Sequence, residues 1–456
     1  MPIVPAKMLY PNWRKYLDRR IPRYTSYPTA VQFGAGVDGR TYERWLAALP
    51  AGAPVSLYLH VPFCAELCLY CGCHTSVARR YTPVAAYVEL LEREIACIGR
   101  LLGQARLSQI HWGGGTPTIL QPRDLTRLTA ALRAHFAVSE ATETAIEIDP
   151  RSLSRAHIAA LADIGVTRAS LGVQDFDARV QAAIRRVQSF DDTARAADGL
   201  RAAGIAKINL DLMYGLPHQS AATLTRTAER ALSLEPDRIA LFGYAHVPWI
   251  KRHQKLIPEA ALPDGDERFA QARAAAEVLT GAGYRRIGLD HFAKESDALL
   301  ERQRQGRLHR NFQGYTTDET PNLIGFGPSA IGALPQGYVQ NSPSMVAYRD
   351  AVLAGRPATV RGTALSAEDR LRGDIIERLM CDLTVDVAEI SAAHGARADH
   401  FADELSRLDE LAADGIVARA GSRISVPEQA RVFVRAVCSV FDAYLAGGEA
   451  RYSRAS

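Results

Sequence analysis

Four of the seven cysteines, Cys64, Cys68, Cys71 and Cys73, lie within a run of ten residues. Thiolates bind zinc and iron–sulfur clusters, and so dense a group in a reducing compartment indicates metal or redox chemistry rather than a disulfide framework. Structural zinc usually takes two separated cysteine pairs, and no second pair follows here. One compact loop can instead hold a [4Fe–4S] cluster by three thiolates and leave one iron open for chemistry. A zinc loop is the alternative.

Glycines and carboxylates further along the chain could bind a polar ligand. Residues 113–116 read Gly-Gly-Gly-Thr, and a backbone without Cβ atoms can approach a ligand closely. No lysine follows as in a P-loop, so the run is weak evidence for phosphate binding. Glu147 and Asp211 fall at the ends of predicted strands, where a carboxylate can accept hydrogen bonds from ribose hydroxyls or an ammonium group.

The elements that position these residues alternate between strand and helix from residue 55 to about residue 293. Predicted strands are 55–61, 108–114, 144–149, 168–173, 206–214, 237–245 and 285–292, and predicted helices include 84–102, 125–136, 154–165, 191–204 and 267–283. This alternation indicates parallel βαβ units and an α/β fold. Six or seven units favour a partial TIM-type (β/α)6 barrel, with a doubly wound open sheet as the second choice.

Chemistry in such folds takes place at the C-terminal ends of the strands. Residues that could bind a ligand lie at or just after the predicted C-terminal ends of the strands. They are the HVPFC run at 60–64, the glycine run, Glu147 and Asp149, Gln174 and Asp175, Asp211, and Tyr244 and His246. Because such residues recur at the ends of successive strands, we expect them to form one shared site.

Four regions are expected along the chain. Residues 1–50 form an N-terminal arm over the active site, and residues 51–295 form the partial barrel. Residues 296–362 are loop-rich and complete the ligand site. Residues 363–456 form a small, mostly helical domain with a winged-helix-like order, which we interpret as a lid; its helix 402–414 is acidic, which argues against nucleic-acid binding.

Composition excludes several classes of protein. The chain has 456 residues, of which 47% are hydrophobic and 23% charged, so it is not disordered, collagenous or coiled-coil. It has no apolar run long enough for a membrane span and no signal-peptide pattern, so we expect a cytoplasmic protein. The net charge of +4 weakly favours an anionic small ligand and gives little reason to expect nucleic acid.

With its CxxxCxxC spacing after the first predicted strand, the chain resembles the radical S-adenosylmethionine (SAM) superfamily. More narrowly, it is similar to the family of oxygen-independent coproporphyrinogen III oxidases. The matching motifs are RYTSYPTA (23–30), YLHVPFC (58–64), CLYCGCH (68–74), HWGGGTPT (111–118), EIDP (147–150), GVQDF (172–176), NLDLMYGLP (209–217), NFQGYTT (311–317) and GPSAIG (328–333). They extend over nearly the whole chain, and the first motif and the Cys-Gly-Cys end of the cysteine run are specific to this family.

The resemblance implies an oxidoreductase that converts the ring A and ring B propionates of coproporphyrinogen III to vinyl groups, giving protoporphyrinogen IX for haem biosynthesis. The expected cofactors are a [4Fe–4S] cluster on Cys64, Cys68 and Cys71 and two molecules of SAM, one of them at the open iron. A 5′-deoxyadenosyl radical made from SAM would remove hydrogen from the propionate. The electron donor and acceptor are not identified, and the family is mostly monomeric.

The same resemblance assigns contacts to the two SAM molecules. Those to the cluster-bound SAM are Tyr58, Gly114, Glu147 and Ile331; those to the second are Tyr70, Gly115, Thr116, Gln174, Arg186, Asp211 and Ala245. For each of these residues, an ordinary polar or packing role at a strand end is the alternative.

Other residues near these motifs are expected to support the cysteine loop or to bind the substrate. Cys73 is expected to lie near the cluster without binding it, and His60 and His74 to surround the cysteine loop as supporting residues. Arg23 in the arm is a candidate partner for a substrate propionate, because arginine pairs with carboxylates in a bidentate way. A haem-binding chaperone on the same scaffold is the alternative function; such relatives generally lack the RYTSYPTA motif and the fourth cysteine.

Overall fold

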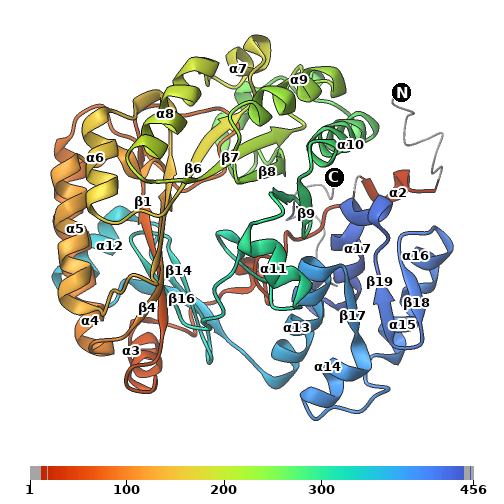
Figure 1. Ribbon diagram of the computed structural model, residues 1–456. Helices are drawn as coiled ribbons and strands as arrows, with labels where there is room; N and C mark the ends of the chain where they lie inside the picture. Colours follow the sequence, from red (N-terminus) through yellow and green to blue (C-terminus); the bar gives the residue numbers. More distant parts are fainter. Residues whose placement is uncertain (1–11, 18, 446–451, 453–456) are drawn as a thin grey trace.

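A mixed sheet of twelve strands forms the centre of the protein (Figure 1). The computed structural model describes residues 12–17, 19–445 and 452. The strand order is β16-β15-β14-β13-β1-β4-β5-β6-β7-β8-β10-β9, and the strands at its two ends do not pair with each other. The sheet is therefore an open, partial barrel, which confirms the expected fold class.

The six predicted barrel strands are confirmed and run parallel to one another. They are β1 (Val55–Val61), β4 (Leu107–Gly114), β5 (Glu143–Ile148), β6 (Arg168–Gln174), β7 (Lys207–Tyr214) and β8 (Arg238–Gly243). In β1, six of the seven residues are buried, as expected for a parallel strand covered on both faces. Because the strands are parallel, their C-terminal ends lie along one edge of the sheet, which brings together the residues predicted at these ends.

Helices cover the outer face of these strands (Figure 1). They are α4 (Thr82–Leu102), α5 (Pro122–His135), α6 (Arg155–Asp163), α7 (Ala178–Ala183), α8 (Phe190–Ala202), α9 (Ala221–Leu232) and α10 (Gly265–Gly281). Local signals define several starts: α8 begins with a capping box between Ser189 and Asp192, and α4 has a proline in its first turn. Their apolar sides share one core with the strands.

The structure corrects the expectation for residues 285–362. The predicted strand 285–292 is two short strands, β9 (Arg285–Ile287) and β10 (His291–Ala293), which form an antiparallel pair because the chain turns at Gly288 (φ +51°). The segment expected to be loop-rich contains α11 (Ala298–Arg304), α12 (Met345–Leu353) and several strands. Those strands are β11 (His309–Asn311), β12 (Gly314–Thr316), β13 (Leu323–Phe326), β14 (Ile331–Leu334), β15 (Gly337–Asn341) and β16 (Thr359–Ala364). Of these, β13 continues the parallel sheet beside β1, and β14 to β16 extend it in antiparallel fashion.

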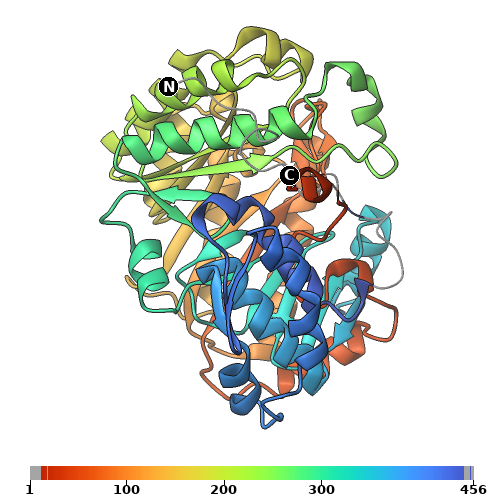
Figure 2. The same ribbon diagram turned by 90° about the vertical axis from the view of Figure 1, so that its right-hand side faces the viewer.

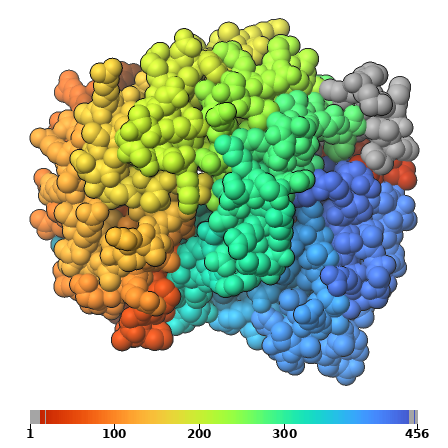
Figure 3. All heavy atoms as spheres, in the orientation of Figure 1, coloured from red at the N-terminus to blue at the C-terminus, as the bar shows by residue number. Residues whose placement is uncertain are grey.

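The C-terminal module, residues 365–445, combines helices with a three-stranded sheet in the order β17-β19-β18. Its elements are α13 (Ala367–Asp382), β17 (Thr384–Asp386), α14 (Val387–Ala393), α15 (Ala402–Arg407), α16 (Asp409–Ala413), β18 (Ala418–Ala420), β19 (Arg423–Ser425) and α17 (Val434–Cys438). The module has its own apolar core. It packs beside α10 and the segment after β10, on one side of the barrel (Figures 2 and 3).

The N-terminal segment is docked on the rest of the protein. Trp13 and Tyr16, beside and within α2 (Arg14–Leu17), contact Phe433 of the C-terminal module edge to face, and Trp13 also contacts Phe269 of α10. Tyr24 and Tyr27 are buried in the same core. By contrast, the next helix, α3 (Gly39–Ala47), packs on the barrel core. The arm therefore joins the module to the barrel over the edge where the strands end.

Among the described residues, no helix combines the length and the apolarity that a membrane crossing requires.

Candidate functional site

The cysteine loop follows β1 and is held against the barrel edge by backbone hydrogen bonds. Within it, β2 (Phe63–Cys64) pairs with β3 (Ser76–Val77), which closes the loop on itself. The amides of Gly115 and Thr116, after β4, donate to the carbonyls of Val61 and Phe63 at 2.8 Å. The cysteine loop and the glycine run are therefore joined by backbone hydrogen bonds. The loop faces a cavity of about 530 Å³, lined by Cys64, Cys68, Cys71 and Cys73 together with residues from the strand ends.

Each of the three predicted ligand sulfurs accepts hydrogen bonds from the protein. Thr75 and Thr116 donate to Cys64 Sγ at 3.2 and 3.4 Å. Cys71 Sγ accepts from the backbone N–H of Cys73 at 3.4 Å, and Cys68 Sγ has arginine donors, described below. Hydrogen bonds to sulfur stabilise thiolates and set the potential of iron–sulfur clusters. The donor set therefore fits a cluster held by three thiolates.

Cys73 differs from the other three cysteines of the loop. Its side chain is exposed, whereas those of Cys64 and Cys71 are half-buried and that of Cys68 is buried. A hydrogen bond from Cys73 lowers the pKa of Cys71 to about 6, so Cys73 supports the Cys71 thiolate. In the part of the chain that the structure describes, no three His, Cys, Asp or Glu side chains are placed to hold a single metal ion.

The glycine run is required by close packing around the cysteine loop. A Cβ on Gly115 would lie 2.5 Å from both the Phe63 carbonyl oxygen and Thr75 Oγ1. Gly114 has φ +114°, and a Cβ there would lie 2.8 Å from the Val61 carbonyl oxygen. These glycines therefore let the backbone after β4 lie directly against the loop.

Most of the predicted SAM-binding residues line the same cavity. They are Tyr70, Gly114, Gly115, Thr116, Glu147, Gln174, Arg186, Asp211 and Ala245. The other two, Tyr58 and Ile331, are not part of this lining; Tyr58 bonds His60 Nδ1 through its hydroxyl at 3.0 Å, and Ile331 lies on β14. The structure thus gathers nine of the residues at one edge, while their individual contacts with SAM stay predictions.

Two arginines connect the cysteine loop with the ends of the strands. Only one of them, Arg186, was predicted from the sequence. Arg186 donates to Gly172 O at 2.6 Å and to Asp149 Oδ2 at 3.2 Å, and its Nη1 lies 3.7 Å from Cys68 Sγ. Arg151 pairs with the same Asp149 oxygen at 2.6 Å and lies 3.9 Å from Cys68 Sγ. Although burial opposes ionisation, the two arginines lower the pKa of Asp149. Arg151 was missed because nothing in its sequence context links it to Cys68.

The histidines around the loop hold its backbone. His60 is buried, which lowers its pKa to about 4, and its Nε2 bonds the carbonyl of His74 at 2.8 Å. It therefore stays neutral near pH 7 and fixes the end of the loop, whereas the hydrogen bonds to sulfur come from threonines, arginines and a backbone amide.

Residues 251–254, around a single turn after β8, hold the same loop from the other side. Lys251 donates to Cys73 O at 2.9 Å, His253 Nε2 bonds Cys71 O at 2.8 Å and Gln254 donates to Tyr70 O at 3.0 Å. Sequence reasoning missed these supports, because they act on backbone carbonyls and leave no motif.

Asp211, on β7, accepts hydrogen bonds from Ser170 Oγ at 2.8 Å and Asn209 Nδ2 at 3.0 Å and lies near Glu147. Burial raises the pKa of Asp211 to about 6, and the charge of Glu147 acts in the same direction, while His291 opposes it. The carboxylate accepts ligand hydrogen bonds best when it is ionised, which is the case above about pH 6.

Replacing Asp211 by Asn is therefore expected to weaken SAM binding by about tenfold or more, the loss of a charged hydrogen bond. In the parent protein, SAM affinity should fall as the pH is lowered through about 6, and the variant should lose this dependence. Equilibrium binding of radiolabelled SAM between pH 5 and pH 8 measures both. An unchanged affinity and pH profile in Asp211→Asn would remove Asp211 from the SAM site.

Comparison with known proteins matches residues 58–231 to the Radical SAM superfamily and residues 365–433 to the HemN C-terminal domain. A protein of Bradyrhizobium diazoefficiens called oxygen-independent coproporphyrinogen III oxidase is 52% identical over 96% of this chain and 98% of its own length. A protein of the same name from Paracoccus denitrificans is 44% identical over 94% of this chain and 95% of its length. The solved structure of coproporphyrinogen III oxidase (HemN) from Escherichia coli, a radical SAM enzyme, covers 94% of this chain and 100% of its own, with a TM-score of 0.88 and 37% identity.

The fold, the cysteine site and these matches define a radical SAM enzyme, an oxidoreductase that uses a [4Fe–4S] cluster and SAM. Within this class, the chain belongs to the family of oxygen-independent coproporphyrinogen III oxidases. Both levels of the expected family are confirmed, and the haem-binding chaperone is not supported.

Proposed function

We propose that the protein carries out the oxidative decarboxylation of coproporphyrinogen III, in which the propionates of rings A and B become the vinyl groups of protoporphyrinogen IX. The family supports this activity over nearly the full length of the chain. The observation that carries the proposal is the cavity in which three hydrogen-bonded thiols face carboxylate and arginine side chains from successive strand ends.

Cys64, Cys68 and Cys71 would hold the cluster, which supplies the single electron that splits SAM into methionine and the hydrogen-abstracting 5′-deoxyadenosyl radical. The chain's own residues then bind, orient and shield. We assign Tyr58, Gly114, Glu147 and Ile331 to one SAM molecule. Tyr70, Gly115, Thr116, Gln174, Arg186, Asp211 and Ala245 are assigned to a second, so that one SAM is consumed for each propionate.

Several residues have geometry that suits these roles. The backbone N–H of Gly114 donates to Glu147 Oε2 at 3.3 Å, which fixes the carboxylate at the cavity wall. Arg186 is buried and bonded to Asp149, so it presents a fixed cation beside Cys68. Glu147, Asp211 and Arg186 together give fixed partners of both signs for a ligand that carries an ammonium, a carboxylate and ribose hydroxyls.

Anaerobic incubation of the cluster-loaded protein with coproporphyrinogen III, SAM and a chemical reductant tests the proposal. Chromatography should show protoporphyrinogen IX, with release of CO2 and formation of 5′-deoxyadenosine. Tight haem binding without vinyl products would contradict the proposal. The electron donor and acceptor in the cell are left open, and we expect a monomer.

A further inference from the structure

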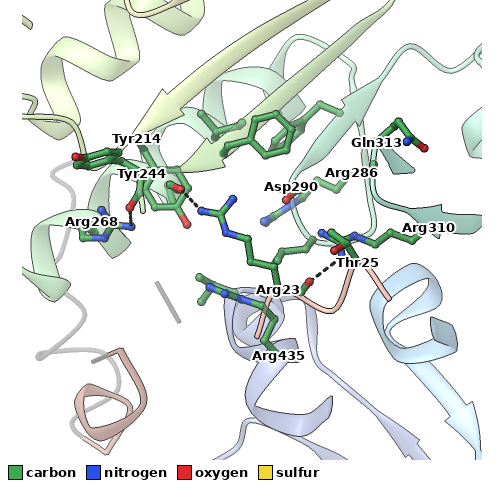
Figure 4. Close-up of a pocket in the computed structure, with 18 of the residues that line it drawn as sticks. Arg23, Thr25, Tyr214, Tyr244, Arg268, Arg286, Asp290, Arg310, Gln313 and Arg435 are labelled. Carbon is green, nitrogen blue, oxygen red and sulfur yellow. Dashed lines mark hydrogen bonds between the residues drawn. The ribbon is translucent and has the colours of Figure 1, made fainter. Parts of the chain in front are cut away.

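A second cavity adjoins the cysteine site beneath the N-terminal arm, and arginines from five segments line it (Figure 4). These are Arg23 of the arm, Arg268 of α10, Arg286 of β9, Arg310 of β11 and Arg435 of α17. We call it the arginine cavity. Its volume of about 200 Å³ is below the roughly 300–1000 Å³ of sites that enclose a whole drug-sized ligand, so it suits side arms rather than a complete tetrapyrrole.

The lining of the arginine cavity carries more positive than negative charge. Among the described residues of the lining, Asp290 is the one acidic residue, and His291 Nδ1 lies 2.8 Å from the Asp290 carboxylate. Arg286 also pairs with Glu428, a half-exposed residue outside the lining, at 3.0 Å. Among the described residues that line the cavity, arginines therefore outnumber carboxylates.

Several of these arginines donate to backbone carbonyls. Arg23 donates to Gly243 O at 2.9 Å, and Arg310 donates to the carbonyls of Arg23 and Tyr24, both at 2.7 Å. A carbonyl accepts a hydrogen bond but does not neutralise a charge. In addition, Arg310 Nε is buried and has no hydrogen-bond partner among the described residues.

The positive charges of the arginine cavity act on one another. Burial lowers the pKa of Arg286 and of Arg435 to about 10, and the charges of Arg23 and Arg310 lower that of Arg435 further. The pKa of Arg23 is lowered as well, mainly by burial. Guanidinium groups from five segments around one cavity favour a ligand with several negative charges.

The arginine cavity is continuous with the cysteine cavity. Arg23, Phe242 and Tyr244 line both cavities, and Tyr214 lies beside Tyr244 in the arginine cavity (Figure 4). None of the residues assigned to SAM lines the arginine cavity. A carboxylate bound there is thus on the far side of an aromatic wall from the cluster.

We propose that the arginine cavity binds the propionates of rings C and D, which the reaction leaves intact. This assignment rests on the proposed function. In a type III porphyrinogen these two propionates flank the same bridging carbon, so they can enter one cavity as a pair of carboxylates. Planar guanidinium groups bind carboxylates in a bidentate way. Anchored there, the macrocycle extends past Phe242 and Tyr244 and presents ring A or ring B to the cysteine cavity, while rings C and D are kept from the radical.

The binding of two oxidised porphyrins tests whether the arginine cavity takes the propionates of rings C and D rather than those of rings A and B. Coproporphyrin III carries all four propionates, whereas deuteroporphyrin IX carries only those of rings C and D. Arg23→Gln and Arg286→Gln are each expected to weaken the binding of both porphyrins by about tenfold, as measured by fluorescence quenching under anaerobic conditions. The double variant should lose about a hundredfold. Iron content and SAM affinity should match those of the parent protein.

Arg285→Gln is the matched control, because Arg285 precedes Arg286 on β9 but is exposed and pairs with Glu295 at 2.6 Å. Its porphyrin affinities should be unchanged. Unchanged binding of deuteroporphyrin IX by both test variants, weakened binding of coproporphyrin III alone, or weakened SAM binding in place of porphyrin binding would each overturn the proposal. If Arg286→Gln loses its cluster, Arg23→Gln carries the test. Vinyl formation by the parent protein is scored separately, so failure of this inference is distinct from failure of the proposed function.

Discussion

Replacing Cys68 by Ser is expected to abolish the brown iron–sulfur absorbance, SAM cleavage and vinyl formation together. Cys68 Sγ is buried beside two arginines, which stabilise a thiolate that a serine hydroxyl does not reproduce. Substitutions of residues that merely support metal ligands cost roughly 10–100-fold, so loss of a ligand should cost more than about 100-fold in vinyl formation. Iron and sulfide analysis with product chromatography measures the effect.

Two other cysteines serve as controls for Cys68→Ser. Cys97 is buried far from the loop and donates to Gly355 O at 3.3 Å, a bond that serine can keep, so Cys97→Ser should retain iron and activity. Cys73→Ser should also retain the full iron content, because Cys73 is a supporting residue rather than a ligand. A complete cluster in Cys68→Ser, or its loss in Cys73→Ser, would contradict the ligand assignment.

Removal of residues 1–30 is expected to stop propionate decarboxylation while the barrel still assembles its cluster and cleaves SAM. None of the described residues of this segment belongs to the barrel core, whereas Trp13, Tyr16, Tyr24 and Tyr27 are buried in the core of the C-terminal module. Truncation also removes Arg23, which lines both cavities. The measurement compares 5′-deoxyadenosine with vinyl product in the same anaerobic reaction.

Truncation changes both packing and chemistry, and Trp13→Ala separates the two. This substitution removes a buried ring and should destabilise the protein by about 3–5 kcal/mol, but it leaves Arg23 in place. At a temperature where it is folded, the Trp13→Ala protein should still form vinyl groups. Normal decarboxylation by the truncated protein would show that the arm has no part in substrate binding.

The sequence predicted the parts of the fold that depend on local patterns. The six barrel strands β1 and β4 to β8 could be recognised because each is a short apolar run, and amphipathic helices alternate with these runs. The cysteine loop was found by its spacing, and its position after β1 placed it at the C-terminal edge of the sheet. Glu147 lies next to the end of β5, whereas Asp211 lies within β7, three residues before the end of the strand. These residues meet because parallel strands share one direction, a property that the strand–helix alternation already implies.

Features that depend on distant contacts were not predicted. The strands that extend the sheet, β14 to β16, are short, and their pairing is set by neighbours rather than by their own pattern. Residues 285–292 were predicted as one strand, but the turn at Gly288 divides this segment into an antiparallel pair. The five arginines of the arginine cavity come from five segments between residues 23 and 435, so no single stretch of sequence reveals it.

Mössbauer spectroscopy of the iron-57-loaded protein, recorded with and without SAM, tests the central claim most directly. The account predicts that one iron of the cluster differs from the rest and that its signal alone shifts when SAM is added, both in the parent protein and in Cys73→Ser. Equivalent irons that do not respond to SAM, or a distinct iron that appears only when Cys73 is replaced, would contradict a cluster held by Cys64, Cys68 and Cys71.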